Sequence, residues 1–289
     1  MCEKNEFGDF QTPESLATRC VALVAELFGT PDVVIEPTAG LGAFLKASAM
    51  RWGQRAKYQG YEINSEYVDA ARKHLRQFAV EIFQRDFFTE DWKRNLARLG
   101  KNRILVIGNP PWVTNSDLGQ LGGNNLPTKT NFQGLRGFDA RTGKSNFDIS
   151  EWMLVRLIEA LPPDGAIAML CKTMTARKVL RHFWKTSGGL QGSRLFRINA
   201  KAEFDVAVAA CHSFASGKRT SEKVATVYTG LDTDTAFTRF GLVDGTLVAN
   251  LDAYRARKIL DGGSSTHTWR SGIKHDAGSV MEFTGHGHK

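Results

Sequence analysis

The sequence predicts an α/β fold in which parallel strands alternate with helices. Amphipathic segments typical of helices occur at residues 14–28 and 65–78. A glycine turn follows the first strand and leads into another helix, as in nucleotide-binding βαβ units. Short segments that indicate strands lie at residues 33–37, 58–63, 81–86 and 104–107, and the first and last of them have the apolar, β-branched character of buried strands.

Length and composition limit the class of protein. The chain of 289 residues fits one large domain, or one domain with a small appendage, and its formal net charge of +8 suits a polyanionic partner. No apolar run approaches the ~20 residues that cross a bilayer, and no signal peptide is visible. Four scattered cysteines indicate reduced thiols, and neither a disulfide framework nor a metal site. These features predict a cytoplasmic protein without membrane association.

The strand at residues 104–107 ends in a stiff corner that reads Asn109-Pro110-Pro111-Trp112. Each proline fixes its own φ and holds the residue before it extended. The Asn109 side-chain oxygen and the Pro110 carbonyl can accept the two protons of an exocyclic amine and draw its nitrogen toward tetrahedral geometry. Trp112 can stack on a base taken out of its helix. The alternative is an ordinary Pro-Pro loop with a surface tryptophan, and these four residues alone do not decide.

The first strand runs into Glu36-Pro37 and a glycine turn, Thr38-Ala39-Gly40-Leu41-Gly42-Ala43-Phe44. The two glycines allow a tight bend and a close approach of the backbone to a ligand. The spacing matches neither the dinucleotide fingerprint nor a phosphate loop. Because Glu36 would repel a phosphate, the turn favours an uncharged or cationic ligand.

Acidic residues end the next two strands. Glu62 lies about 20 residues after the glycine turn, where a carboxylate can accept from two ribose hydroxyls. Asp86 can accept from an adenine amine while Phe87 covers the ring. For Glu62 the alternative is a surface carboxylate at a strand end.

The ordered set of motifs resembles that of S-adenosylmethionine-dependent DNA adenine methyltransferases whose cofactor motifs come first. Glu62 resembles the ribose ligand of that family, and Asp86-Phe87 the adenine ligand. The resemblance covers roughly residues 7 to 230. Three further segments resemble the upstream cofactor segment, the methionine-binding turn and the catalytic motif (here with Trp for the commoner Tyr or Phe): Phe10-Gln11-Thr12-Pro13, Glu36-Pro37-x-x-Gly40-x-Gly42-x-Phe44 and Asn109-Pro110-Pro111-Trp112.

The resemblance implies a Rossmann-like, seven-stranded, mostly parallel sheet with helices on both faces and a terminal β-hairpin. Residues 1–230 would form the catalytic domain and residues 231–289 a C-terminal extension. The first and fourth strands would be neighbours, so the glycine turn and the Asn109 corner would share one crevice. The expected S-adenosylmethionine-binding residues are Thr12, Pro13, Glu36, Pro37, Thr38, Ala39, Gly40, Gly42, Phe44, Glu62, Ile63, Asp86, Phe87, Asn109 and Phe147.

The segment of about 34 residues after the catalytic corner is expected to close over double-stranded DNA. Its candidates for phosphate contact are Lys129, Arg136, Arg141 and Lys144. A solvated loop is the alternative for each of these residues.

Helices are expected from Phe147 to about Leu161 and at residues 173–184, and a strand at residues 166–171. Thr12 and Pro13 are expected to cap and begin the first helix. Residues 204–214 and 223–228 indicate a closing hairpin. Within that hairpin, Phe214 is a candidate to stack on the flipped base opposite Trp112, with a core phenylalanine as the alternative.

Beyond Gly230 the sequence predicts a hairpin turn at Asp244-Gly245 and a short helix at residues 251–260. Residues 269–276 resemble a segment that follows the catalytic domain in long restriction–modification polypeptides, where a target-recognition domain comes next. We therefore expect a stub of that domain here, with two alternatives: the chain is truncated, or a separate specificity or nuclease subunit completes it. Two alternatives remain: a methyltransferase for a protein glutamine or an RNA base, and an inactive cofactor-binding subunit that binds DNA.

Overall fold

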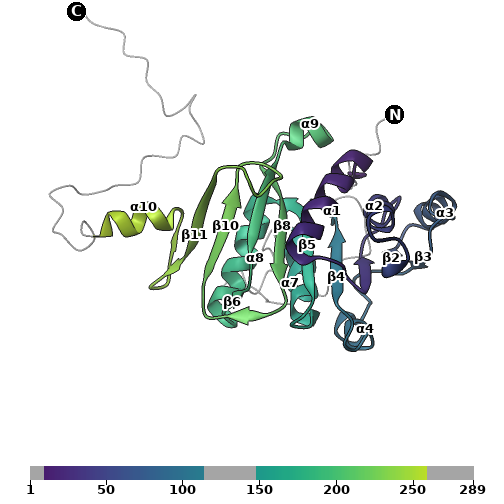
Figure 1. Ribbon diagram of the computed structural model, residues 1–289, viewed down its shortest axis with the longest axis horizontal. Helices are drawn as coiled ribbons and strands as arrows, with labels where there is room; N and C mark the ends of the chain where they lie inside the picture. The colour runs from purple at the N-terminus through teal and green to yellow at the C-terminus, as the bar shows by residue number, and fades with distance from the viewer. Residues whose placement is uncertain (1–9, 114–147, 259–289) are drawn as a thin grey trace, which may run out of the picture. The chain divides into compact units, whose positions relative to one another are not determined.

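A computed structural model describes residues 10–113 and 148–258 and contains a ten-stranded central sheet (Figure 1). The strands are β1 (Val33–Glu36), β2 (Lys57–Glu62), β3 (Val80–Gln84), β4 (Ile104–Gly108), β5 (Ala166–Lys172), β7 (Arg194–Ile198), β8 (Ala210–Ser216), β10 (Val224–Tyr228), β11 (Phe237–Val243) and β12 (Thr246–Val248). Two short strands, β6 (Gly189–Leu190) and β9 (Arg219–Thr220), pair separately. The helices are α1 (Glu14–Phe28), α2 (Ala43–Trp52), η1 (Gly53–Arg55), α3 (Ser65–His74), α4 (Trp92–Ala97), α7 (Ile149–Ala160), α8 (Thr173–Thr186), α9 (Ala200–Phe204) and α10 (Leu251–Ala256).

The strand order β12-β11-β10-β7-β8-β5-β4-β1-β2-β3 contains the predicted switch point. The five strands from β3 to β5 are parallel, and β1 lies between β2 and β4. Val33, at the start of β1, is in register with Lys57 on one side and Ile104 on the other. The carboxyl ends of β1 and β4 therefore open toward the same crevice, where ligands bind in such sheets.

Helices cover both faces of the sheet, as the sequence predicts. In β4, Leu105 and Ile107 join the core cluster that includes buried residues of α1 and α2. Ile104 and Val106 join the opposite cluster, which includes buried residues of α4, α7 and α8. Because successive side chains of a strand point to opposite faces, a strand covered on both faces must be apolar throughout. This explains the continuous apolar run of β4.

The predicted closing hairpin is wrong. Strand β8 pairs with β7, and β10 pairs with the other side of β7, so β8 and β10 are not neighbours. Strand β7 was missed because it is short and its sequence, Arg-Leu-Phe-Arg-Ile, has charged residues at two of its five positions. It enters the sheet between two segments that follow it in the chain.

The sheet is also longer than the seven strands expected. Strand β11 pairs with β10, and β12 with β11 through a two-residue turn at Asp244-Gly245, whose φ angles are 48° and 81°. This is the predicted hairpin, with the positive φ values that such turns require. A compact unit runs through Asp252, so the boundary expected after residue 230 does not coincide with a break in the sheet.

The described residues show neither a membrane-spanning helix nor a cluster of metal ligands. None of the helices that the structure describes is both long and apolar enough to span a bilayer. Nor do the described His, Cys, Asp and Glu side chains form any group of three or more suited to a metal ion. The cysteines among these residues, Cys20, Cys171 and Cys211, are buried free thiols.

Candidate active site

The glycine turn and the Asn-Pro-Pro corner lie side by side at the ends of β1 and β4. A Cβ atom built on Gly108 would lie 3.4 Å from Cγ of Glu36 and 3.7 Å from Cδ of Pro37. The strand order requires this neighbourhood, because β1 and β4 pair directly and in parallel. Any ligand on the turn would thus lie next to Asn109.

The glycine turn depends on its two glycines. Gly40 and Gly42 have φ angles of 51° and 81°, which side chains rarely adopt. Gly42 is also the N-cap of α2, in the left-handed conformation. A Cβ at Gly40 would lie 2.8 Å from Oε1 of Gln11, whose side chain accepts a hydrogen bond from the Leu41 amide at 3.1 Å. Gln11 therefore supports the turn, a role that the sequence analysis did not assign.

The Glu62 carboxylate is held against the same turn. Its Oε2 accepts a hydrogen bond from the Gly40 amide at 2.8 Å, and its Oε1 accepts one from the Asn64 amide at 2.9 Å. Asn64 in turn caps α3. Ile63, between them, is 51% exposed. The tip of β2 thus holds a fixed carboxylate beside the turn and an apolar side chain in solvent.

Glu36 is buried, with only 3% of its surface exposed. Its Oε2 accepts a hydrogen bond from the Leu45 amide, in the first turn of α2, at 3.2 Å. Burial raises the pKa of this carboxyl well above its usual range, against the effect of the Leu45 amide, and the nearby Glu62 charge raises it further. Glu36 therefore joins strand and helix as a carboxyl group that holds its proton over a wide pH range.

The end of β3 is built around aromatic packing. Asp86 Oδ1 accepts a hydrogen bond from the Phe88 amide at 2.9 Å. The Phe87 ring is 5% exposed and packs against Trp92, with ring centroids 4.9 Å apart, and against Trp152. The backbone carbonyl of Phe87 accepts a hydrogen bond from the Trp92 indole at 3.0 Å. Phe87 is thus rigidly placed, beside an Asp86 carboxylate that is only partly buried.

Asn109 carries a buried acceptor. Its Nδ2 donates a hydrogen bond to the Phe10 carbonyl at 3.1 Å, across 99 residues of sequence. Because a carbonyl can only accept, this bond determines which way the amide is turned. Among the described residues the Oδ1 atom, although buried, has no hydrogen-bond partner. A buried acceptor left unpaired costs roughly 1–3 kcal/mol, which a ligand N–H group could recover.

An aromatic cluster, Phe10, Trp112 and Phe204, borders Asn109. The Trp112 ring centroid lies 5.8 Å from that of Phe10 and 5.2 Å from that of Phe204. Trp112 is 5% exposed, and its indole N–H donates to the Leu170 carbonyl at 3.4 Å. A base could stack on Trp112 only after a neighbouring ring moves. Phe204, at the end of α9, was missed because only the folded chain brings it to Trp112.

The groups around the crevice suit S-adenosylmethionine. Besides Asn109 Oδ1, the hydroxyl of Thr38 in the glycine turn is buried and has no described partner. Two acidic side chains lie on one side of the crevice, because Glu62 ends β2 and Asp86 follows β3; the buried Glu36 keeps its proton and adds no charge. Acidic groups favour a cationic ligand, and unpaired polar atoms favour one that forms hydrogen bonds. The residues present therefore fit a sulfonium nucleoside better than a phosphate.

Comparison with known proteins gives a consistent result. The chain is 41% identical to the type II methyltransferase M.NspV of Nostoc sp. over 285 residues, which is 97% of this chain and 59% of that protein. The chain is homologous to a type II methyltransferase. It spans less than two thirds of that relative's length. No family model matches the sequence.

Solved structures show the same fold for this methyltransferase homologue. It superposes on the methyltransferase subunit of a type I restriction–modification system from Streptococcus thermophilus with a TM-score of 0.53 and 14% identity, covering 87% of this chain and 52% of that one. A modification subunit of a putative type I restriction enzyme from Vibrio vulnificus gives a TM-score of 0.51 and 13% identity, covering 88% and 61%. At these identities the likeness concerns the Rossmann-like fold alone.

Three predictions that the sequence analysis makes for side chains of this chain are wrong. Phe214 pairs in register with Ala168, which in turn pairs with Ile107 inside the sheet. Its side chain is buried in the core, so Phe214 is a core phenylalanine and not a residue that stacks on a base. Phe44 is fully buried in the same cluster, so its side chain supports α2 from within. The first helix begins at Glu14 with Pro13 as N-cap, and Thr12 makes no side-chain cap.

Five of the expected site residues lie outside the described part of the chain. Five other predicted site residues lie in the two motifs at the ends of β1 and β4: Pro37, Thr38, Ala39, Pro110 and Pro111. Those outside are the cofactor candidate Phe147 and the phosphate-contact candidates Lys129, Arg136, Arg141 and Lys144.

Proposed function

We propose that this protein transfers a methyl group from S-adenosylmethionine to the exocyclic amine of adenine in double-stranded DNA, as the modification part of a restriction–modification system. The homologous Nostoc protein is a methyltransferase by name, and two proteins of the same fold are named as subunits of restriction systems. The choice of adenine rests on the resemblance of the Asn109-Pro110-Pro111-Trp112 motif. A cytoplasmic location is part of the proposal, because the described cysteines are free thiols.

The unpaired Asn109 Oδ1 is the observation that carries the proposal. An exocyclic amine is a weak nucleophile because its lone pair is delocalised into the ring. Asn109 Oδ1 and the Pro110 carbonyl can accept its two protons and hold the nitrogen close to tetrahedral geometry. The Phe10 carbonyl keeps the Asn109 amide in the orientation that this requires. Because these acceptors are fixed before the substrate arrives, little reorganisation is needed during reaction.

The cofactor side of the site has a separate task. S-Adenosylmethionine supplies, when bound, an electrophilic methyl group on a sulfonium. The residues that would hold it are the glycine turn, the Thr38 hydroxyl, and the Glu62 and Asp86 carboxylates. Glu62 is already oriented by two backbone amides, so one carboxylate position near the turn is determined before binding. We infer that Phe87 contributes by rigid packing at the adenine end.

Substitution Asn109→Ala tests the assignment. We expect tritium transfer from labelled S-adenosylmethionine to duplex DNA to fall by at least 10²–10³-fold, the usual effect of removing one preorganised group. Calorimetric affinity for the cofactor should remain close to wild type. Asn102→Ala is a matched control, since Asn102 is an exposed asparagine whose Nδ2 bonds only to the Leu99 carbonyl. Near-native transfer by the Asn109 variant would contradict the catalytic assignment.

The same assay separates the alternatives. Duplex DNA, structural RNA and protein substrates are tested side by side with one enzyme preparation. Transfer to RNA or protein, and none to DNA, would replace the proposed substrate. Cofactor binding without transfer to any of them would favour an inactive DNA-binding subunit. The assay is repeated with added specificity or nuclease subunits, the partners that we propose.

A further inference from the structure

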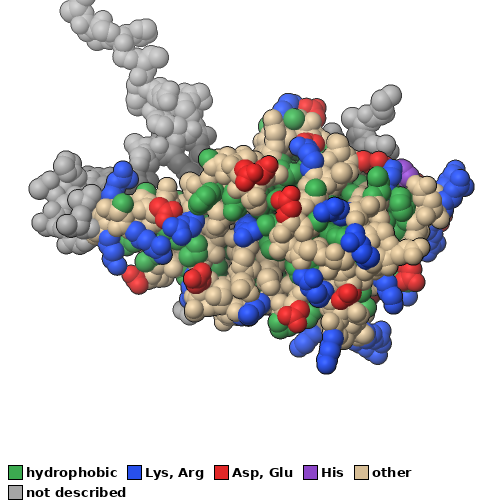
Figure 2. Space-filling view, viewed as in Figure 1, with side chains coloured by type: hydrophobic (Ala, Val, Ile, Leu, Met, Phe, Trp, Pro, Cys, Tyr) green, Lys and Arg blue, Asp and Glu red, His purple; other side chains and the backbone are tan. Residues whose placement is uncertain are grey.

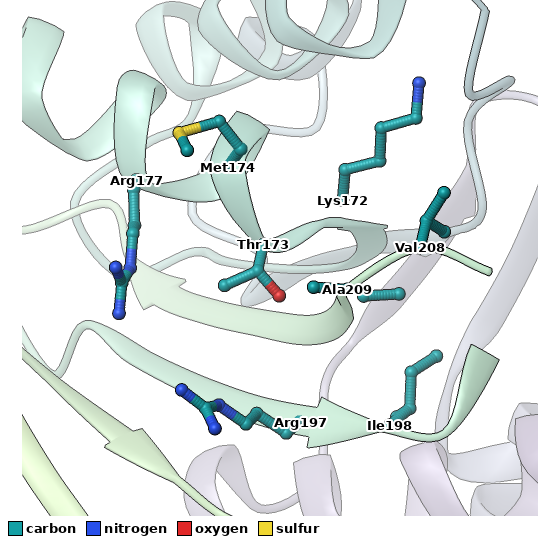
Figure 3. A pocket seen from close by; sticks show the side chains of 9 residues that line it. Lys172, Thr173, Met174, Arg177, Arg197, Ile198, Val208 and Ala209 are labelled. Carbon is teal, nitrogen blue, oxygen red and sulfur yellow. The ribbon is translucent and has the colours of Figure 1, made fainter. Parts of the chain in front are cut away.

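A second hollow opens on the carboxyl edge of the sheet, beyond the site described above. It has a volume of about 550 Å³ and lies among the end of β5, the start of α8, the end of β7 and the segment before β8 (Figure 3). The Thr173 amide donates to the Ala209 carbonyl at 2.8 Å, which ties α8 to the segment before β8. The pocket is therefore formed by well-packed elements.

Two arginines give the pocket its charge. Arg177 of α8 and Arg197 of β7 extend to the same side of the pocket in Figure 3, whereas Lys172 points away from them. Neither guanidinium takes part in an ion pair with any described residue, and the buried Nε of Arg177 has no described hydrogen-bond partner. In contrast, Lys172 pairs with Asp148 at 2.9 Å, and Lys178 with Glu151 at 3.5 Å.

Like charges that share a pocket without a carboxylate favour an anion between them. Arg177 is also held in place, because its guanidinium carbon lies 5.0 Å from the Phe240 ring centroid. A held guanidinium loses less conformational entropy when it binds a planar or tetrahedral oxyanion. The pocket therefore matches a phosphate group better than a neutral ligand.

The rim of the pocket is apolar. Met174 is 63% exposed and Val208 is 38% exposed, although both are hydrophobic. Both side chains line the pocket, and in Figure 3 Met174 lies beside Arg177 while Val208 lies on the side of Lys172. An apolar rim next to two cations suits a ligand with both a hydrophobic and an anionic part, such as a sugar joined to a phosphate.

The pocket lies close to the catalytic corner. The Trp112 indole bonds to the Leu170 carbonyl, and the pocket begins two residues later in β5, at Lys172. At a rise of about 3.3 Å per residue, this is a distance of roughly 7 Å along the strand. The near edge of the pocket, at Lys172, therefore lies close to the residue that Trp112 contacts.

We propose that the pocket binds a backbone phosphate of the DNA strand next to the target nucleotide, with Arg177 and Arg197 as the paired ligands of one phosphate. This inference rests on the proposed function and adds a contact that positions the strand and carries no sequence information. Met174, which lies beside Arg177 (Figure 3), contacts the sugar next to that phosphate.

The test is the salt dependence of DNA binding by the full chain. A fluorescent duplex of mixed sequence is titrated at several salt concentrations with wild type, Arg177→Gln/Arg197→Gln and Arg181→Gln. Each phosphate contact contributes about 0.9 to the slope of log affinity against log salt. We expect the double variant to lose about that much slope and at least tenfold in affinity at low salt. Arg181, an exposed residue one turn farther along α8, is the matched control and should change neither value appreciably.

Four results would overturn the proposal. The slope of the double variant could equal that of wild type, or the Arg181 control could lose as much as the double variant. Inorganic phosphate could bind the pocket while the DNA slope stays unchanged, which would indicate a site for a free anion. Wild type that binds cofactor but no DNA would also overturn it, and would contradict the proposed function as well. If the double variant has a smaller salt slope for DNA binding and an unchanged affinity for the cofactor, the result supports the phosphate contact without testing the catalytic assignment.

Discussion

His212 in β8 offers a quantitative test of how the core is built. Its side chain is completely buried between β5 and β7, in register with Leu170 and Phe196, and neither ring nitrogen has a partner among the described residues. Burial lowers the pKa of this imidazole from 6.5 to about 3. The folded protein therefore keeps His212 neutral at pH values where the unfolded chain protonates it.

The sign and size of the effect follow from proton linkage. The unfolded chain binds more protons than the folded chain between pH 6.5 and pH 3, so stability is greatest above 6.5 and falls as the pH is lowered. Between pH 7 and pH 5 the unfolded histidine goes from mostly neutral to almost fully protonated, whereas the folded one takes up almost no proton. This lowers the free energy of unfolding by about 2 kcal/mol.

Substitution His212→Leu removes the titrating group at nearly constant volume. Urea unfolding at pH 7 and pH 5 measures the difference in stability between variant and wild type. We expect the variant to gain about 2 kcal/mol relative to wild type on going from pH 7 to pH 5. The control Phe196→Leu, at the neighbouring register position, should lose about the same stability at both pH values. Equal pH dependence in His212→Leu and wild type would refute the buried, neutral histidine.

Further predictions concern the crevice. Because burial raises the pKa of Glu36, wild type should lose stability as the pH rises above about 4.5. In urea unfolding at pH 5 and pH 8, Glu36→Gln should show no such difference in stability. If the variant keeps the pH dependence of wild type, Glu36 is not the group responsible. Gly42→Ala should lower the free energy of unfolding by about 1–2 kcal/mol because of the positive φ, and further because the new Cβ would lie 2.6 Å from Cδ1 of Leu75. The control Gly53→Ala has a φ of 57° and no atom within 4 Å of the new Cβ, so it should show only the loss from backbone strain. Glu62→Ala should weaken cofactor binding in calorimetry while the melting temperature stays within a few degrees; unchanged affinity would exclude Glu62 as a ligand.

The surface around these elements carries many cations, in line with the net charge of +8 (Figure 2). Several ion pairs between described residues have two exposed side chains, such as Arg156 with Glu159. Such pairs contribute little to stability. The two pocket arginines differ from them because they line one pocket and neither pairs with a described carboxylate.

Much of the amino-terminal half could be predicted from local signals. Helix α1 and strand β1 have almost the predicted bounds, because an apolar face at helical spacing and a short β-branched run each act over a few residues. The glycine turn and the Asn109 corner are likewise local, since positive φ and fixed proline φ depend on single residues. Parallel strand order then placed both motifs at one switch point.

The carboxyl-terminal half could not be predicted in the same way. Strand β7 lies between β8 and β10, an order that no local pattern encodes. Phe214 is an aromatic at a plausible sequence position, but its register with Ala168 puts it inside the core. The sequence shows that an aromatic residue lies in a strand, but it does not show the register in which this strand pairs with its neighbour.

By itself, the sequence determined the alternation of strands and helices, the glycine turn and the proline corner, because these depend on neighbours in the chain. Only the tertiary structure decided that the Phe10 carbonyl orients the Asn109 amide, that Phe204 reaches Trp112, and that Arg177 and Arg197 share a pocket. Each of these contacts joins segments far apart in sequence, and their energy depends on packing that no single segment contains.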